Sequence, residues 1–247
     1  PEWLVYDIEH YSALIEIYYN QNKELGKKLL LKCINKLKDQ KDNDYLAVSS
    51  RIFTSFGNNF PNEKLTESLI IKSIEIKEML SDKPGLARSY GSLTRMYCEK
   101  EPTSTKALES CNNWLTLNKE LNDVFGIIMS KNYLAKIYFS LFKSNKSDIT
   151  NLDKSKNLYT ENIKHIQNKI DDGSKIQIFT SYADLMEIAK YEKDEKSYLG
   201  YSKELFNLIK NFGKIENKFF QNIFEKAFDS NFKKSLITKS KIREILG

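Results

Sequence analysis

The sequence predicts an all-α protein made of about six stacked helical hairpins. Only 9 of the 247 residues are Gly and 4 are Pro, while 40% are hydrophobic, so helix breakers are rare in a chain able to bury a core. Helical three-and-four periodicity runs through the chain, without the alternation typical of strands. A pair of large residues one helical turn apart also returns about every forty positions, which is typical of stacked repeats.

The recurring pairs set the register of the predicted repeats. They are Leu14/Tyr18, Phe53/Gly57, Leu93/Tyr97, Leu134/Tyr138, Leu185/Ala189 and Phe224/Phe228, of which the second and fifth are weaker matches. Residues at this spacing share one helix face, so we interpret them as packing residues that carry no chemistry. A single hairpin cannot bury its apolar face alone, so neighbouring hairpins are expected to stack into a curved array.

The first hairpin is predicted from two amphipathic stretches. Residues 2–20 form the first helix, and its apolar positions follow the spacing of one helix face: Leu4, Ile8, Tyr11, Ile15 and Tyr18. Residues 23–38 form the second helix, with Leu30, Ile34 and Leu37 turned inward. The run 42–44 (Asp-Asn-Asp) ends this hairpin, because such side chains cap backbone amides.

The other helices are predicted in pairs between polar or Pro- and Gly-containing breaks. The pairs are 44–57 with 62–80, 84–99 with 104–121, 123–142 with 152–170, 175–191 with 195–211, and 215–229 with 233–246. Pro61 suits the start of a helix, and Gly213 suits a helix C-cap. The polar stretch 144–151 is read as a loop insertion that lengthens one repeat. No break differs from the others, so a single domain over 1–247 is expected.

Charge and cysteine content limit the compartment and the partners. The net charge is +6, and most of the excess lies after Lys203. Two interpretations of this excess remain open: a solvated lysine-rich helix face, and contact with nucleic acid through Lys233, Lys234, Lys239, Lys241 and Arg243.

The three cysteines lack CxxC spacing, which favours free thiols in a reducing, cytoplasmic compartment. No membrane-spanning stretch or secretory signal is expected, and the start at Pro1 indicates a fragment of a longer protein.

The repeats resemble the tetratricopeptide repeat family in its long variant of about forty residues per unit. The resemblance is best where Tyr90, Leu93, Thr94, Tyr97 and Ala107 occupy the family's pattern positions. The junction at 80–86 (LSDKPGL) also recurs at 121–127 (LNDVFGI). The resemblance implies a right-handed α-α superhelix whose concave groove is lined by the first helix of each hairpin.

In such arrays, groove positions lie two and five residues on either side of the anchor Leu. Applied to this chain, this rule gives Arg51, Arg88, Gly91, Arg95, Cys98, Met129, Asn132, Lys136, Phe139, Ala183, Glu187 and Lys190. Of these we single out as the ligand-binding groove Arg51, Arg88, Arg95, Asn132, Lys136 and Phe139. Three of the chain's four arginines fall at groove positions. Because Arg binds carboxylates and phosphates through two parallel hydrogen bonds, a basic patch is expected there, with Asn132 meeting a peptide backbone and Phe139 an apolar group.

These features favour a non-catalytic module that binds an acidic protein or peptide. No catalytic residue, cofactor or metal site is predicted, because His10 and His165 are the only histidines and neither joins a motif. Such a module would act as a scaffold or sensor in a bacterial signalling, regulatory or defence protein. Three alternatives remain open at this point: a peptide-pheromone receptor domain of a transcriptional regulator, a nucleic-acid-binding repeat, and an array whose end helices are buried in a partner or in a second copy.

Overall fold

The fold is seen in a computed structural model that describes residues 1–165 and 171–212. These residues form helices and connecting loops, without a strand. The helices are α1 (Trp3–Tyr18), α2 (Lys23–Leu37), α3 (Asn43–Asn59), α4 (Thr66–Met79), α5 (Lys83–Lys100), α6 (Thr105–Glu120), α7 (Val124–Ser144), α8 (Ile149–Lys164), α9 (Asp172–Glu192) and α10 (Glu195–Phe212). The predicted helices 215–229 and 233–246 lie outside the described residues.

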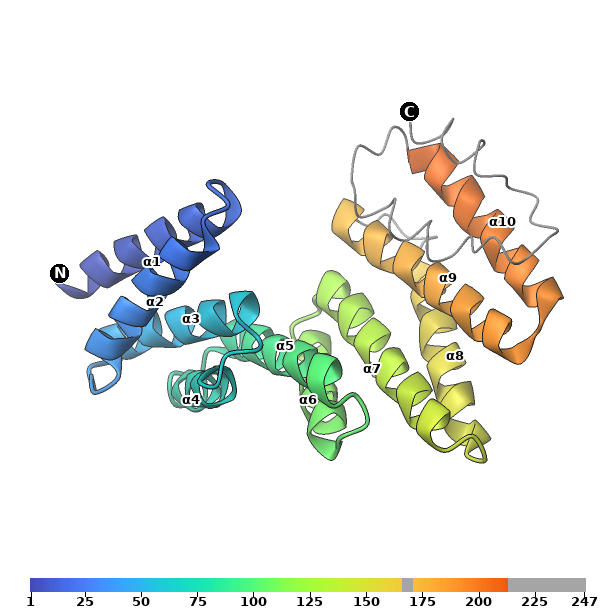
Figure 1. Ribbon diagram of the computed structural model, residues 1–247, viewed down its shortest axis with the longest axis horizontal. Coiled ribbons are helices and arrows are strands. Elements are labelled where there is room, and N and C mark those ends of the chain that lie inside the picture. Colours follow the sequence, from blue (N-terminus) through green and yellow to red (C-terminus); the bar gives the residue numbers. More distant parts are fainter. Residues whose placement is uncertain (166–170, 213–247) are drawn as a thin grey trace.

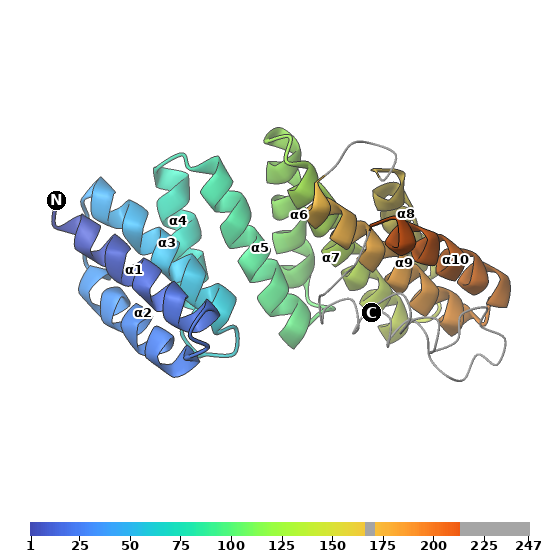
Figure 2. The ribbon, with the colours of Figure 1, turned by 90° about the horizontal axis from the view of Figure 1, so that it is seen from above.

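Consecutive helices pack as five hairpins that follow one another in a row. Each odd-numbered helix contacts the even-numbered helix after it and the next odd-numbered helix, so α1, α3, α5, α7 and α9 form a continuous layer. Figures 1 and 2 show α1 and α2 at one end of the row, and α9 and α10 at the other. The all-helical, hairpin-by-hairpin architecture agrees with the prediction.

Two junctions between hairpins share one backbone geometry, as their matching sequences suggest. Ser81 and Asn122 adopt left-handed backbone conformations, with φ of 56° and 54°. The next residues, Asp82 and Asp123, each accept a hydrogen bond from the backbone N–H three positions on, at 2.9 and 3.0 Å. A left-handed residue after one helix followed by an Asp cap on the next is a compact way to reverse the chain. The repeated sequence therefore encodes a repeated turn.

Two helix starts differ from the prediction because side-chain hydrogen bonds decide them. Helix α4 begins at Thr66 rather than at residue 62, since the Thr66 hydroxyl donates to the Phe60 carbonyl and holds the intervening residues in turns. Helix α9 begins at Asp172 rather than at residue 175. The Asp171 carboxylate accepts from the Ser174 N–H at 2.9 Å, which places the cap at the start of the predicted break.

The predicted insertion at 144–151 is shorter in the structure. Helix α7 continues to Ser144, and α8 starts at Ile149, so only four residues connect them. Lys143 and Ser144 are exposed at the end of α7, so their polarity is compatible with a further helical turn. Polar composition therefore marks solvent exposure here rather than the end of a helix.

The packing of α2 is as predicted, whereas that of α1 is not. Leu30, Ile34 and Leu37 are buried. The predicted apolar face of α1 is instead exposed; its side chains are Leu4 (42%), Ile8 (58%), Tyr11 (58%), Ile15 (50%) and Tyr18 (62%). The residues of α1 that are buried are His10, Ala13 and Ile17. Gly26 explains why α1 buries this side. A side chain at position 26 of α2 would collide with Ile17 and the Ala13 carbonyl, so the glycine lets the two helices approach closely there. The prediction that this face packs within the array was wrong.

Candidate functional site

A partly enclosed region of the described surface lies where α5, α7, α8 and α9 meet. Two cavities of about 330 and 570 Å³ adjoin there, and Phe139, Lys143 and Glu187 line both. Five groove positions of the repeat register converge on them: Cys98 from α5, Lys136 and Phe139 from α7, and Glu187 and Lys190 from α9. We call these joined cavities the α7/α9 hollow. Residues more than ninety positions apart in the chain thus share one binding-sized space.

An aromatic cluster forms one wall of the α7/α9 hollow. The Phe139 and Phe142 rings stack with centroids 6.5 Å apart, and Tyr191 meets both edge-on at 5.9 and 5.7 Å. The Lys143 ammonium lies 4.6 Å from the Phe139 centroid. These are favourable aromatic and cation–π arrangements, and they hold the wall rigid. The hollow therefore offers an apolar surface with a cation at its edge.

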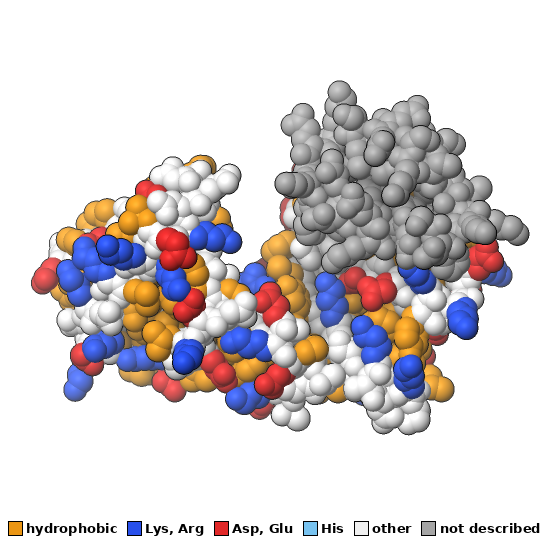
Figure 3. Space-filling view, viewed as in Figure 1, with side chains coloured by type: hydrophobic (Ala, Val, Ile, Leu, Met, Phe, Trp, Pro, Cys, Tyr) orange, Lys and Arg blue, Asp and Glu red, His pale blue; other side chains and the backbone are white. Residues whose placement is uncertain are grey.

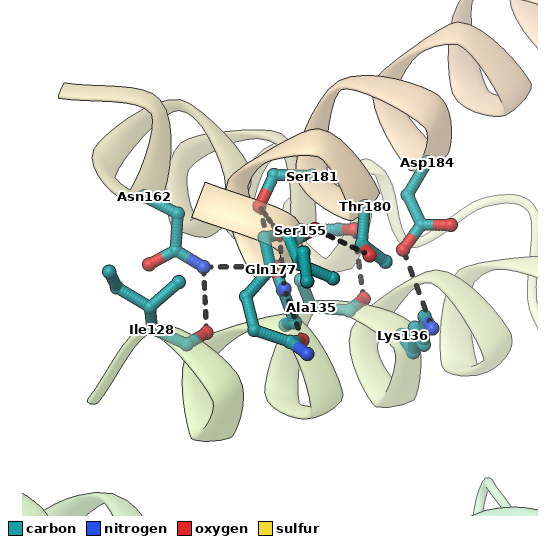
Figure 4. A network of polar contacts seen from close by, with 11 residues as sticks. Ile128, Ala135, Lys136, Ser155, Asn162, Gln177, Thr180, Ser181 and Asp184 are labelled. Carbon is teal, nitrogen blue, oxygen red and sulfur yellow. Dashed lines mark hydrogen bonds and ion pairs between the residues drawn. The ribbon is translucent and has the colours of Figure 1, made fainter. Parts of the chain in front are cut away.

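The rest of the rim carries both signs of charge. Lys136 Nζ lies 3.6 Å from the Asp184 carboxylate, whose Oδ2 is buried and accepts no hydrogen bond from the described residues (Figure 4). Burial raises the pKa of Asp184, and the Lys136 charge and a hydrogen bond from Tyr159 oppose that rise. Glu187 is exposed one turn further along α9. Figure 3 shows cationic, anionic and hydrophobic side chains intermixed over α7.

The three arginines of the predicted basic patch lie apart from this hollow, on α3 and α5. Arg51 pairs with Asp7 at 2.9 Å, and Arg95 donates to the Asn58 side chain at 2.6 Å. Arg88 is exposed and makes no hydrogen bond or ion pair within residues 1–165 and 171–212. Two of the three guanidinium groups are therefore engaged within the protein.

No protein-family model matches this chain, and no curated protein resembles it significantly.

Asn132 lies in a buried polar network between α7, α8 and α9. Its side chain is 2% exposed and donates to the Gln177 carbonyl at 2.8 Å. The side-chain carbonyl oxygen of Asn132 accepts hydrogen bonds from Asn162 at 2.9 Å and from Ser181 at 2.6 Å (Figure 4). Asn162 also donates to the Ile128 carbonyl at 2.9 Å. All of these contacts are internal, so Asn132 joins three helices instead of facing a ligand.

Replacing Asn132 by alanine is expected to lower the free energy of unfolding by about 2 kcal/mol, because it removes three buried hydrogen bonds, those that Asn132 makes with the Gln177 carbonyl, Asn162 and Ser181. Urea denaturation measures this loss. Lys119→Ala, at an exposed position of α6, is the control, and its effect should stay within about 0.5 kcal/mol. If Asn132→Ala were as stable as the wild type, the network would be of little consequence to the fold.

A Ser-His-Asp arrangement that was not predicted links α1 to α3. His10 Nε2 lies 2.8 Å from the Ser55 hydroxyl, and Asp7 is 4.0 Å from His10 Nδ1. The Asp7 carboxylate is directed to Arg51, and Nδ1 has no hydrogen-bond partner among the described residues. A hydrolytic triad needs a hydrogen bond from the acid to hold the imidazole. Burial also lowers the pKa of His10, and we interpret the contact as structural.

The remaining reactive groups of the described part give no sign of chemistry. Within it, no group of three His, Cys, Asp or Glu side chains could hold a metal ion. Cys33, Cys98 and Cys111 are free thiols whose pKa values are raised by burial, to about 12 for the first two. No described helix has the length and apolar character needed to cross a bilayer. The five predicted nucleic-acid contacts, Lys233, Lys234, Lys239, Lys241 and Arg243, lie outside the described residues.

Lys143, Asp184 and Tyr191 are among the residues of the α7/α9 hollow that sequence reasoning missed. Lys143 and Tyr191 each lie four residues beyond a predicted groove position, Phe139 and Glu187. Helices α7 and α9 are both 21 residues long, which extends the hollow by a turn. Continuing the i+4 series along these two long helices would have found both. Asp184 lies next to the anchor Leu185, where the register rule expects no groove residue.

Proposed function

We propose that this chain is a non-catalytic binding module that holds a peptide or protein segment in the α7/α9 hollow. The observation that supports the proposal is the convergence of α5, α7, α8 and α9 on two adjoining cavities of peptide-binding size. In this proposal the hairpins form a tetratricopeptide-like, right-handed array. The module acts as a scaffold or sensor within a signalling, regulatory or defence protein.

The lining of the hollow favours a segment that carries one apolar side chain and an acidic group. Phe139 and Tyr191 offer an aromatic wall for the apolar side chain. Lys143 lies at the edge of that wall and forms no ion pair within the described residues, so it can meet a carboxylate. Lys136 can serve the same role by exchanging Asp184 for a ligand carboxylate. This proposal moves the basic contacts from the predicted arginines to two lysines.

The thiols suit a reducing compartment. Cys33 and Cys111 are buried and unpaired, which is usual for a protein kept reduced in the cytoplasm. A short peptide signal, as in the peptide-pheromone receptors, is one source of such a ligand, and a segment of a partner protein is another. The same hollow would serve both.

Selection of a displayed random-peptide library on the immobilised protein tests the proposal. Wild-type protein should enrich peptides with an apolar residue near an acidic one. The double variant Lys143→Glu/Glu187→Lys should bind the synthetic form of those peptides about tenfold or more weakly by fluorescence anisotropy, because it reverses the charges lining both cavities.

The matched control is Lys119→Glu/Glu75→Lys, which reverses one charge of each sign at exposed positions of α6 and α4. Its affinity should equal that of the wild type. Failure to enrich any peptide, or equal loss in both double variants, would count against a binding site in the hollow.

A further inference from the structure

The exposed face of α1 gathers more of the exposed large hydrophobic side chains than any other helix of the described residues. The five side chains of the face share it with Val5 and Tyr19, which are 53% and 82% exposed. Met79, Ile149 and the other exposed large hydrophobics outside α1 are scattered over several helices. Hydrophobic side chains are visible over the end of the array where α1 and α2 lie (Figure 3). A contiguous apolar patch of this kind marks an interaction surface.

The spacing of the face indicates what kind of partner covers it. Leu4, Ile8, Tyr11, Ile15 and Tyr18 follow one another at intervals of four, three, four and three residues. This is the spacing of the seam by which one helix packs lengthwise against another helix. Among the described elements, none packs on this side of α1, since α2 and α3 contact the opposite side through Ala13 and His10.

Two of the acidic side chains of α1 are directed away from this seam. Asp7 pairs with Arg51 of α3 at 2.9 Å, and Glu9 pairs with Lys32 of α2 at 2.7 Å. The seam itself carries neither an acidic nor a basic residue, so it offers nothing for a charged partner such as nucleic acid. An apolar helix is the complementary surface.

We infer that the partner is a second copy of this chain, joined by antiparallel pairing of α1 with α1 about a two-fold axis. The seam is nearly palindromic about Tyr11, with Leu4 and Tyr18 seven residues to either side and Ile8 and Ile15 between. In an antiparallel pair, Tyr11 meets Tyr11 of the partner subunit, and each Ile8 lies opposite the partner's Ile15. A two-fold interface requires such self-complementarity.

The face is large enough to support such a dimer. An aromatic side chain buries about 150–250 Å². Tyr11, Tyr18 and Tyr19 are each more than half exposed, so together they leave several hundred Å² uncovered before the four aliphatic side chains are added. A specific interface takes about 800 Å² from each partner. The seam lies at the opposite end of the row from the α7/α9 hollow, so dimerisation leaves the hollow free (Figure 1).

Sedimentation equilibrium of the full chain tests the inference. Wild type should form a dimer with a Kd in the micromolar range. Ile8→Glu/Ile15→Glu should raise the Kd by about a hundredfold or more, because it buries four carboxylates in each dimer. Far-UV circular dichroism should show unchanged helicity, since both side chains are at least half exposed. A wild type that stays monomeric at high micromolar concentration would overturn the inference.

Two controls fix the location of the interface. Met79→Glu/Ile149→Glu changes two side chains that are 71% and 62% exposed on α4 and α8, and it should leave the Kd unchanged. Mild oxidation of Tyr11→Cys should link two chains through a symmetric disulfide, whereas Met79→Cys should not form one. A dimer that ignores the α1 double variant, or equal cross-linking at both cysteines, would place the interface elsewhere and refute the pairing of α1.

Discussion

Replacing Tyr97 by alanine is expected to lower the free energy of unfolding by about 3–5 kcal/mol, as other large-to-small changes in protein cores do. Tyr97 is 7% exposed and packs in the cluster that joins α4, α5, α6 and α7. Its hydroxyl donates to Glu67 of α4 at 2.7 Å, and Lys106 of α6 lies over its ring. One side chain thus connects two hairpins, and urea denaturation measures its loss.

Two further variants separate the contributions. Tyr97→Phe removes only the hydrogen bond to Glu67 and should cost about 1 kcal/mol. Tyr18→Ala alters the equivalent residue of the first repeat, which is 62% exposed, and should change the stability of the monomer by less than about 0.5 kcal/mol when it is measured below the Kd of the proposed dimer. Equal losses from Tyr97→Ala and Tyr18→Ala would contradict the burial that the structure assigns to them.

The contrast between these two tyrosines shows what a repeat pattern can and cannot predict. The Leu-x-x-x-Tyr spacing predicts a helix and its apolar face correctly in both repeats. It does not say which neighbour covers that face, because covering depends on helices that lie next to it in space. Within the array Tyr97 has a hairpin on each side, whereas α1 has described elements on one side only.

In the weak copies of the motif the anchor position stays filled although the residue type changes. Gly57 stands where Tyr is expected, and a Cβ atom there would lie 2.5 Å from Ile70. The space is filled from α4 instead of from α3. Ala189 is likewise 2% exposed. The sequence predicts the position of such an anchor. That a side chain from the neighbouring helix fills the space left by a small residue is visible only in the structure.

The candidate site was predictable to a similar degree. The register rule placed Lys136, Phe139 and Glu187 on one surface, and the structure brings them to the α7/α9 hollow. The same rule selected Asn132, which α8 and α9 bury. Periodicity within α7 defines its faces, while the close packing of α9 against α7 decides which part of a face stays open.

A buried lysine in the second hairpin was not anticipated from the sequence at all. The Lys77 side chain is 2% exposed, and its ammonium donates to the Thr54 hydroxyl at 2.7 Å and the Ser89 hydroxyl at 2.8 Å. No carboxylate forms an ion pair with it within the described residues. Burial lowers the pKa of Lys77 to about 8, with Asp82 opposing this change and nearby arginines adding to it.

The lowered pKa means that the charge of Lys77 works against folding at neutral pH. The native state releases this proton near pH 8, whereas an ordinary lysine keeps it to about 10.5. Between these values the unfolded chain binds more protons, so the contribution of Lys77 to stability rises with pH. The difference between the two pKa values corresponds to about 3 kcal/mol. Above the unfolded pKa the cost of burying the charge has vanished.

Replacing Lys77 by methionine is therefore expected to stabilise the protein at pH 7, by about 1–3 kcal/mol. The hydroxyls keep partners without the amine, since Thr54 donates to the Ser50 carbonyl at 3.0 Å and Ser89 lies 2.9 Å from Thr54. One repeat earlier, Leu37 occupies the corresponding position and is 1% exposed, which shows that an apolar side chain fits.

The pH dependence of this gain is the decisive measurement. The advantage of Lys77→Met over wild type should shrink by about 1 kcal/mol between pH 7 and pH 9, as the native wild type loses its proton. The buried thiols titrate equally in both proteins, so their contribution cancels in the difference. Lys119→Met, at an exposed position of α6, should show no such slope. A Lys77→Met protein less stable than wild type at both pH values would show that the amine's hydrogen bonds outweigh the cost of burying its charge.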